Sequence, residues 1–267
     1  MKLDKSLLVR IFGPKAAFFH GDTLILDRWK FVKRHLPETR NGERVFDAGC
    51  GSGAFTINLA RRGYRGVGLS WDERNQAAAS ERAAICGVAD ATSFPIGDLR
   101  KLGELSEHVG RYDYVLSLES IEHVLDDRKL VRDLAACLRP GGWLVLTTPN
   151  KDYRAITPGD DGPFSTQEDG WHVRRGYTGE MLRELALGAG LRVEEIGGCS
   201  GFFSQKLTEV MRRFGWLGWA ATAPLRVVPI LLDGITQRIT GYPDYSITMV
   251  AYRPRFEPLP LSQSEPT

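Results

Sequence analysis

The stretch Val45-Phe-Asp-Ala-Gly-Cys-Gly-Ser-Gly53 decides the fold of this 267-residue chain. Three glycines at alternate positions, Gly49, Gly51 and Gly53, follow an apolar pair and a single acid, Asp47. Because glycine lacks a Cβ, such a loop lets the backbone turn sharply and approach a ligand closely. A helix that begins after the loop presents free N–H groups and the positive end of its dipole to that ligand. The stretch therefore predicts a strand, a ligand-binding loop and a helix.

The acid before the glycines narrows the class of ligand. A carboxylate at Asp47 would repel a pyrophosphate but accept hydrogen bonds from an ammonium group, which favours an amino-acid-bearing nucleoside over a dinucleotide. The loop also comes close to the G-x-G-x-x-G pattern of nicotinamide-dependent oxidoreductases. From the loop alone, such an oxidoreductase and a non-catalytic cofactor-binding module stay open as alternatives.

Strand-like and helix-like patterns alternate outward from the loop. We expect strands at 44–47, 66–69, 91–96, 112–118, 143–148, 191–196 and 246–252, and helices at 54–62, 74–86, 127–138 and 178–189. Asp127 is the expected N-cap of the third helix, and Pro140-Gly-Gly142 its expected end. Alternation of this kind is typical of an α/β protein with a parallel sheet covered by helices.

The ends of the chain lie outside this alternation. One helical face near the N-terminus collects apolar side chains, at Ile25, Trp29, Val32 and Leu36. These predict an N-terminal helical cap over residues 1–40. The core is expected at 41–198 and 245–256, an insertion at 199–244, and a flexible tail at 257–267.

Composition excludes several classes of protein. The chain is 42% apolar and 25% charged, which is unlike a disordered or collagen-like chain. Its four cysteines contain no C-x-x-C pair, and the N-terminus lacks an unbroken apolar stretch, so we expect reduced thiols and a cytoplasmic protein. The longest charge-free apolar run, 214–225, is too short to span a bilayer. Residues 45–198 are net acidic, whereas both flanks are basic.

Four stretches, taken in order, resemble the motifs of class I S-adenosylmethionine-dependent methyltransferases. They are Val45–Gly53, Phe94-Pro-Ile-Gly-Asp-Leu99, Tyr112-Asp-Tyr-Val-Leu-Ser-Leu-Glu-Ser-Ile-Glu-His-Val124 and Leu138-Arg-Pro-Gly-Gly-Trp-Leu-Val-Leu-Thr-Thr-Pro-Asn150. By motif, the sequence is most similar to ubiquinone-pathway O-methyltransferases. The resemblance spans about 40–198 plus the last strand. It implies a Rossmann-like, seven-stranded, mostly parallel sheet with the last strand antiparallel and helices on both faces.

The resemblance implies S-adenosylmethionine as the cofactor. The glycine loop would hold its methionine part, Asp98 and Leu99 would meet the adenine, and Glu119 would lie beside the cofactor. The expected cofactor-binding residues are therefore Asp47, Ala48, Gly49, Gly51, Gly53, Leu69, Ser70, Trp71, Asp98, Leu99 and Glu119.

One position departs from the family pattern. Members usually end the second strand with an acid that binds the ribose hydroxyls, and our alignment places Gly68 there. Ser70, Asp72 or Glu73 could accept hydrogen bonds from the ribose instead. Trp71 could stack on the adenine, or it could pack on the edge of the sheet.

The acceptor side is predicted from a cluster of acids and imidazoles. Glu119, Glu122 and His123 are spaced i, i+3 and i+4, so a helical turn after the fourth strand would project all three from one face. With His172 they could hold a divalent cation such as Mg²⁺ or Zn²⁺. This Glu-x-x-Glu-His pattern resembles one in the ubiquinone-pathway enzymes and in small-RNA 2′-O-methyltransferases. In those enzymes a metal orients the acceptor hydroxyl.

A metal-free hydrogen-bond network is the alternative. His123 is then the preferred general base, Glu122 assists it, and His172 is either a second base or the cap of the following helix. A hydroxyl acceptor needs such a base, so the predicted reaction is transfer of a methyl group to an oxygen. N- or C-methylation by the same fold stays open.

The insertion 199–244 bears on the partner. Its apolar residues, interleaved with arginines, predict either a lid over the site or a basic amphipathic surface that approaches an anionic membrane to reach a lipid-like acceptor. Pro224 and Pro229 favour the lid. Nucleic acid is disfavoured because no binding motif is present. The sequence names neither the acceptor nor the oligomeric state.

Overall fold

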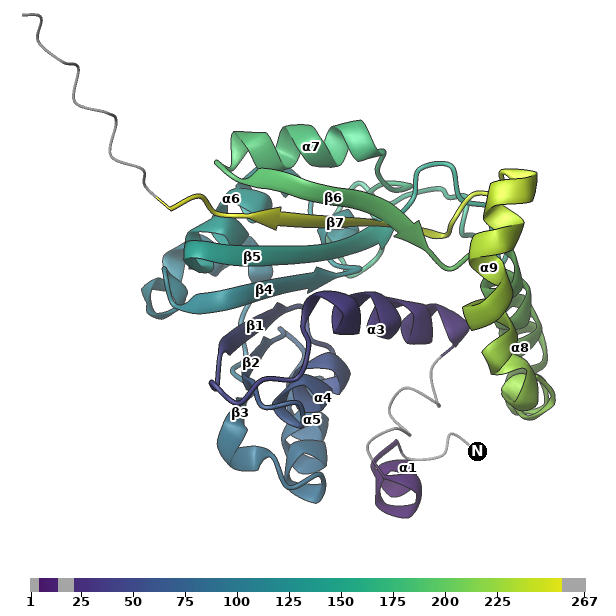
Figure 1. Ribbon diagram of the computed structural model, residues 1–267, viewed down its shortest axis with the longest axis horizontal. Helices are drawn as coiled ribbons and strands as arrows, with labels where there is room; N and C mark the ends of the chain where they lie inside the picture. The colour runs from purple at the N-terminus through teal and green to yellow at the C-terminus, as the bar shows by residue number, and fades with distance from the viewer. Residues whose placement is uncertain (1–4, 14–21, 256–267) are drawn as a thin grey trace, which may run out of the picture.

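A seven-stranded sheet forms the centre of the molecule, in the order β3-β2-β1-β4-β5-β7-β6 (Figure 1). The computed structural model describes residues 5–13 and 22–255, so the expected tail lies outside the described residues. The strands are β1 (Arg44–Ala48), β2 (Arg65–Leu69), β3 (Thr92–Ser93), β4 (Tyr112–Leu118), β5 (Leu138–Pro149), β6 (Arg192–Cys199) and β7 (Ser246–Tyr252). β7 runs antiparallel to both β5 and β6, and the other pairs are parallel. This confirms the expected fold class.

Helices cover both faces of the sheet. They are α1 (Lys5–Phe12), α3 (Thr23–His35), α4 (Ala54–Ala60), α5 (Glu73–Ile85), α6 (Asp127–Cys137), α7 (Gly179–Gly188), α8 (Phe202–Thr222) and α9 (Val227–Thr240). Strand residues alternate between two cores: Phe46 faces α6 and α7, whereas its neighbour Val45 faces α3 and α4. The predicted face of α3 packs in this second core, where Val32 and Leu36 are fully buried.

Three local predictions need correction. The third strand is two residues long, and a single bridge from Ser70 to Ile96 continues its line. The N-cap of α6 is Asp126, because the carboxylate of Asp127 is already engaged by Tyr177 and Arg174. The expected helix-ending turn at 140–142 lies inside β5, which begins at Leu138 and changes register with β4 beyond its first residue.

The insertion folds into two helices that pack against each other at one end of the sheet. α8 bends at Gly215, where φ is +58°, and the short 3₁₀ helix η5 (Ala223–Arg226) joins it to α9. Within the described residues, Phe202–Thr240 is long and apolar enough to be a candidate membrane span. Of its most apolar 18-residue stretch, 22% is buried inside the protein. The charge-free apolar run 214–225 lies inside this longer stretch. The bend and η5 divide the longer stretch into separate helices.

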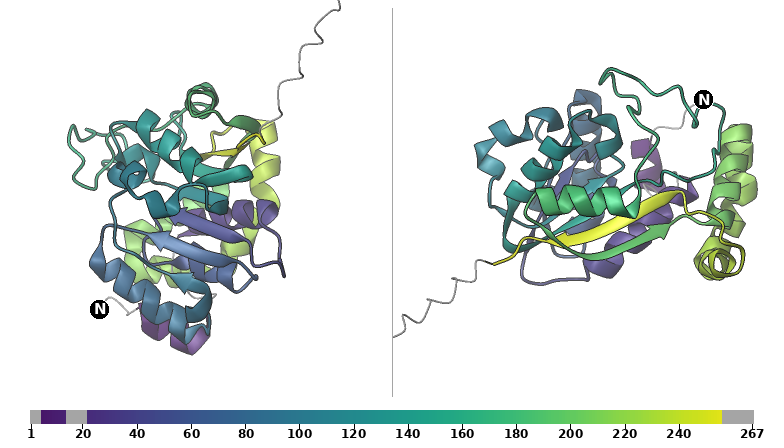
Figure 2. Two further views of the ribbon diagram at one scale, coloured as in Figure 1. Left: turned by 90° about the vertical axis from the view of Figure 1, so that its left-hand side faces the viewer. Right: turned by 90° about the horizontal axis from the view of Figure 1, so that it is seen from above.

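The order of the strands predicts a crevice between the carboxyl ends of the two central strands β1 and β4. The chain leaves β1 toward β2 on one side and returns to β4 on the other, and ligands of open α/β sheets bind where the order reverses. Figures 1 and 2 show α8 and α9 at the same end of the sheet, where β4 and β5 finish.

Candidate active site

The glycine loop joins β1 to α4 in a conformation that only glycine adopts readily. Gly49, Gly51 and Gly53 all have positive φ, of +88°, +51° and +75°. A Cβ at Gly49 would lie 2.4 Å from the hydroxyl oxygen of Ser120, at the end of β4. That hydroxyl donates to the carbonyl of Ala48 at 3.2 Å, so the ends of β1 and β4 are held together directly under the loop.

A cavity of about 520 Å³ opens above the loop, within the size range of small-molecule sites. Seven of the predicted cofactor-binding residues line it, namely Gly49, Gly51, Ser70, Trp71, Asp98, Leu99 and Glu119, and so does His123. The other four, Asp47, Ala48, Gly53 and Leu69, lie outside its lining. The cavity therefore gathers residues from β1, β2, β4 and the segment after β3, as the motifs predict.

Asp47 supports the loop from behind. Its side chain is 2% exposed and accepts a 2.7 Å hydrogen bond from the hydroxyl of Thr56 on α4. Burial raises the pKa of Asp47 to about 6, whereas the bonds from Thr56 lower it. Direct contact between Asp47 and a cofactor stays a prediction, and the described contacts give it a role in joining β1 to α4.

The end of β2 shows which of the candidate residues near the expected acid line the cavity. Gly68 lies inside the sheet, where a Cβ would come within 2.8 Å of the Cys50 sulfur, so this position has no room for a side chain that reaches the cavity. Ser70 lines the cavity instead, whereas Asp72 caps α5 and Glu73 is outside the lining. Trp71 also lines the cavity and is 69% exposed, so it does not pack on the sheet edge.

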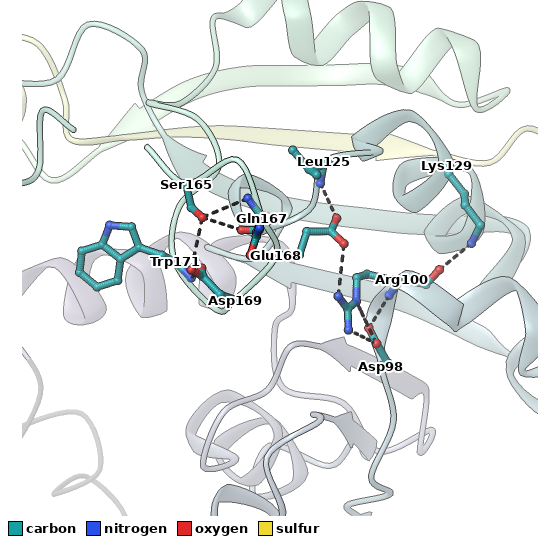
Figure 3. A network of polar contacts seen from close by, with 9 residues as sticks. All are labelled: Asp98, Arg100, Leu125, Lys129, Ser165, Gln167, Glu168, Asp169 and Trp171. Atoms are coloured by element: carbon teal, nitrogen blue, oxygen red, sulfur yellow. Dashed lines mark hydrogen bonds and ion pairs between the residues drawn. The ribbon is translucent and has the colours of Figure 1, made fainter. Parts of the chain in front are cut away.

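A polar network closes one side of the cavity (Figure 3). Arg100, in the 3₁₀ helix η2 (Leu99–Glu104), donates from Nε at 2.9 Å to the carboxylate of Asp98 and from its terminal nitrogen at 3.3 Å to Glu168. Hydrogen bonding to Arg100 lowers the pKa of Asp98, so this carboxylate stays an ionised acceptor. Glu168 accepts from the backbone N–H of Leu125 at 2.6 Å. The loop that carries Glu168 is thereby fastened over the cavity.

The part of the cavity that His123 lines is built on the 3₁₀ turn η4 (Ile121–His123). Glu122 is fully buried beneath it, and its Oε2 accepts a 3.0 Å hydrogen bond from Thr148 on β5. Its Oε1 lies 4.0 Å from His123 Nε2. The ring of His172 meets the ring of His123 edge-on, with 4.7 Å between their centres. Burial, and then the charge of Glu119, raises the pKa of Glu122 well above its usual range.

The expected role of His172 as a helix cap is wrong, because Thr178 caps α7. A backbone bond of 2.9 Å from Val173 to the Glu122 carbonyl holds the loop, and His172 with it, against the turn. Burial, and more weakly His123, lowers the pKa of His172, which favours the neutral imidazole.

Glu119 does not join the other acid and the imidazoles. It precedes the 3₁₀ turn and has a φ of +54°, and its Oε1 accepts a 3.0 Å hydrogen bond from Ser246 on β7. The prediction of one face shared by Glu119, Glu122 and His123 is therefore wrong. Burial alone would lower the pKa of Arg28 on α3, but Glu119, then Asp22, and more weakly Cys199 and Glu122 raise it. Arg28 therefore stays charged beside these acids.

Three of the four predicted metal ligands fit a cation. One ligand atom each from Glu122, His123 and His172 lies within 4.8 Å of the others. Glu122 Oε1 and His123 Nδ1 are buried without a hydrogen-bond partner among the described residues. Two imidazoles and a carboxylate suit Zn²⁺ better than Mg²⁺, which prefers oxygen ligands. Glu119 is outside this group because its carboxylate is turned toward β7.

Comparison with known proteins decides the family. Residues 23–196 match the model of a family described as a methyltransferase domain. The chain belongs to this methyltransferase family. A methyltransferase domain does not fit the alternative of a nicotinamide-dependent oxidoreductase.

Curated relatives of this methyltransferase include two ubiquinone biosynthesis O-methyltransferases. One, from Bordetella avium, is 30% identical over 158 residues, which are 58% of this chain and 63% of the relative. The other, from Marinobacter nauticus, is 30% identical over 165 residues, 59% of this chain and 67% of the relative. The match thus spans less than two thirds of the first relative's length.

Among solved structures, an S-adenosylmethionine-dependent methyltransferase from Mesorhizobium loti has a similar fold. Its TM-score is 0.56 with 21% sequence identity, over 88% of this chain and 100% of that one. At this identity the likeness shows the fold alone. Together with the strand order, it confirms the Rossmann-like sheet of the methyltransferase.

Sequence reasoning missed several residues of the methyltransferase site. Ser120 lies inside the motif Tyr112–Val124. Its contact with Gly49 forms only when β1 and β4 pair, so the motif alone does not reveal it. Arg100 and Glu168, which both line the cavity, are 68 residues apart, and Arg28 of the N-terminal cap, outside that lining, interacts with the charge of Glu119. No periodicity or motif in the sequence connects these positions to the cavity.

Proposed function

We propose that this methyltransferase transfers the methyl group of S-adenosylmethionine to a hydroxyl group of a small-molecule or lipid-like acceptor, and that His123 takes the hydroxyl proton. The observation that carries the proposal is the position of His123. It lines the same cavity as the glycine loop and Asp98, and a buried carboxylate and a second imidazole lie beside it. An imidazole thus borders the space in which a methyl group would be transferred.

The chemistry of methyl transfer explains why this base matters. A sulfonium is a good leaving group, so alignment of the acceptor with the methyl group provides much of the rate acceleration. A neutral hydroxyl is a weak nucleophile until its proton is removed, whereas an amine with a free lone pair needs no such help. An imidazole titrates near neutral pH and can accept that proton. The arrangement therefore favours oxygen over nitrogen.

Residues around His123 would position its ring. Glu122 lies behind it with its Oε1 4.0 Å from Nε2, and His172 restricts the ring from the side. Glu122 itself is fixed by the bond from Thr148. Two relatives at 30% identity that are named ubiquinone biosynthesis O-methyltransferases support an oxygen acceptor independently of this geometry.

A metal-assisted form of the same reaction is the second candidate. It is favoured by the group Glu122, His123 and His172 and by the unpartnered Oε1 of Glu122. These three residues would hold the ion, and a bound divalent ion lowers the pKa of a coordinated hydroxyl. In that case His123 would orient the acceptor through the ion instead of removing its proton.

Formation of S-adenosylhomocysteine in the presence of phenols, aliphatic alcohols and amines tests the proposal. We expect turnover with a hydroxyl acceptor, and we expect His123→Ala to lower it by about 100-fold or more while S-adenosylhomocysteine still binds. Methylation confined to amines, or full activity of His123→Ala, would overturn the proposal.

The same assay after dialysis against a chelator separates the two candidates. Loss of activity that zinc restores supports the metal-assisted form. Unchanged activity, with no metal detected by elemental analysis, supports His123 acting alone as the base.

A further inference from the structure

The outer surface of the insertion exposes apolar side chains to solvent. Eleven of the nineteen large apolar side chains that are exposed in the described residues lie between Val210 and Ile239. α9 has fourteen residues, and Pro229 is the one that is buried. Monomeric proteins rarely leave an apolar surface of this extent uncovered. The surface formed by residues 210–239 of α8, η5 and α9 is called the α8–α9 face below.

The exposed side chains follow the turns of the helices. On α9, Val227, Leu231, Ile235 and Ile239 stand one turn apart, with exposed fractions between 52% and 78%. On α8, Trp216 is 75% exposed, and Phe214 and Leu217 are each more than half exposed. A helix of a soluble domain normally turns such a stripe toward its core. Here the stripe faces away from the sheet.

Basic side chains border the α8–α9 face. Within Phe202–Thr240, five basic residues stand against two acids. Both acids are already engaged: Glu209 pairs with Lys206 at 2.8 Å, and Asp233 accepts from the first N–H groups of α8. Arg213 and Arg238 have no acidic partner in the part of the chain that the structure describes.

A groove beside α9 brings basic and acidic side chains next to apolar ones. Lys30, Arg34 and Arg238 line it together with Asp27, Asp233 and Asp244, and its apolar lining includes Ile230, Leu231 and Ile235. Arg34 also pairs with Glu195. Basic groups therefore stand next to the exposed aliphatic side chains, the arrangement found in interfacial helices that bind anionic lipid.

We infer that the α8–α9 face docks on the surface of an anionic lipid bilayer. The apolar stripe and Trp216 enter the interfacial region, and Arg213 and Arg238 meet the lipid phosphates. A second copy of this chain fits the face less well, because a two-fold interface would bring its basic residues against each other. The bent, interrupted helices suit a surface that lies on the bilayer.

The face lies at the end of the molecule that holds the active site. α8 is fastened to α3 through a 2.6 Å bond from Thr23 to the Ser204 carbonyl, and α3 carries Arg28 toward Glu119. The insertion contributes no residue to the lining of the cofactor cavity, whereas the loop around Glu168 contributes three, Glu168, Asp169 and Gly170. Taken with the proposed function, on which this step rests, docking would present the site to an amphiphilic hydroxyl acceptor in the bilayer.

Flotation of the full chain with vesicles, without acceptor or cofactor, tests docking separately from catalysis. We expect binding to vesicles that contain phosphatidylglycerol at low salt, and weaker binding to pure phosphatidylcholine or at about 0.5 M salt. Leu231→Glu/Ile235→Glu should lower binding at least about tenfold. Leu187→Glu is the matched control, because Leu187 is 66% exposed on α7 and lies outside the face.

The basic border gives a second measurement. Arg213→Ala and Arg238→Ala should each weaken binding to anionic vesicles by about fivefold and leave binding to neutral vesicles unchanged. Brominated lipids should quench the emission of Trp216, and Trp216→Phe should remove that quenching.

Three results would overturn the inference. The first is failure of the unaltered chain to float with anionic vesicles at low salt. The second is equal binding by the Leu231→Glu/Ile235→Glu and Leu187→Glu variants, with circular dichroism showing both to be folded. The third is a dimer in sedimentation velocity that only Leu231→Glu/Ile235→Glu dissociates, since the face would then bind a second copy. None of these results depends on methyl transfer.

Discussion

Substitution of Gly49 by alanine tests the geometry of the cofactor loop. Gly49 has a φ of +88°, and a Cβ there would lie 2.4 Å from the Ser120 hydroxyl oxygen and 3.2 Å from the Ser120 Cβ. The first distance is far shorter than a contact between a methyl carbon and a hydroxyl oxygen, so the serine must move. Its hydroxyl then loses the 3.2 Å hydrogen bond to the Ala48 carbonyl, which connects β4 to β1.

Two costs add in the folded state of Gly49→Ala. A non-glycine residue at this φ costs about 1–2 kcal/mol, and loss of the Ser120 bond costs about 1 kcal/mol. We therefore expect the free energy of unfolding to fall by about 2–3 kcal/mol. Ser120 also lines the cavity, so the displaced side chain takes up space that the cofactor would use. We expect affinity for S-adenosylhomocysteine to fall at least about tenfold, or 1.4 kcal/mol.

Calorimetric titration and urea unfolding measure these two effects. Gly87→Ala is the control, because Gly87 also has a positive φ, of +67°, but has no atom within 4 Å of a Cβ and lies outside the cavity lining. It should lose about 1–2 kcal/mol of stability and no affinity. Adding Ser120→Ala to Gly49→Ala removes the colliding oxygen and should restore part of the affinity. If Gly49→Ala binds as the unaltered chain does, or if Ser120→Ala has the same effect in both backgrounds, the close approach of β4 to the loop is wrong.

Three further outcomes follow from the site and its surroundings. His172→Ala removes one of the three clustered ligand atoms and should lower zinc affinity by about 10-fold or more if the ion binds there. Equal zinc affinity of the variant and the unaltered chain would exclude a zinc site at Glu122, His123 and His172. Burial raises the pKa of Asp27 from 3.8 to about 6, so its stabilising contribution is present below about pH 4 and is lost as the pH rises through about 6. Asp27→Asn should therefore flatten the decline of unfolding free energy between about pH 4 and pH 7, by about 2 kcal/mol, and an unchanged slope would contradict the burial of this carboxyl. Arg100→Ala should change global stability by less than about 1 kcal/mol but speed amide hydrogen exchange in the loop around Glu168; unchanged exchange would show that the network in Figure 3 does not hold the loop.

The order of the core elements was predictable because their signals are local. β4 and β7 were predicted at their observed bounds, and α3 was found from one apolar face. Each of these elements carries its own periodicity, which its neighbours in the fold do not alter. The third strand was overestimated, since at the edge of the sheet only Thr92 and Ser93 pair with β2.

The site was predicted where a residue follows directly from its strand. Gly49, Ser70, Asp98 and His123 come just after strand ends, and all four line the cavity. Prediction failed where a local conformation was assumed: the positive φ of Glu119 turned its carboxylate away from the predicted cluster.

The interactions of Arg100 and Arg28 could not be predicted from the sequence, for a different reason. Arg100 meets Glu168 from 68 residues away, and the charge of Arg28 is balanced by acids at the end of β4. Such pairs depend on how a loop and a terminal helix fold back over the sheet. No spacing within the sequence predicts which of these distant residues meet.

The insertion shows the limit of periodicity most clearly. The apolar residues of α9 recur at the spacing that predicts an amphipathic helix, but this spacing says only that one side differs from the other. Which side faces the protein depends on the surface that the rest of the chain provides for packing. Here α3 and α8 cover little of α9. Both interpretations of 199–244, a lid and a membrane-facing surface, share the same sequence pattern and differ only in burial. Only 22% of the most apolar 18-residue stretch of Phe202–Thr240 is buried, and the cofactor cavity takes no lining residue from the insertion. These two observations favour testing the membrane-facing surface before the lid.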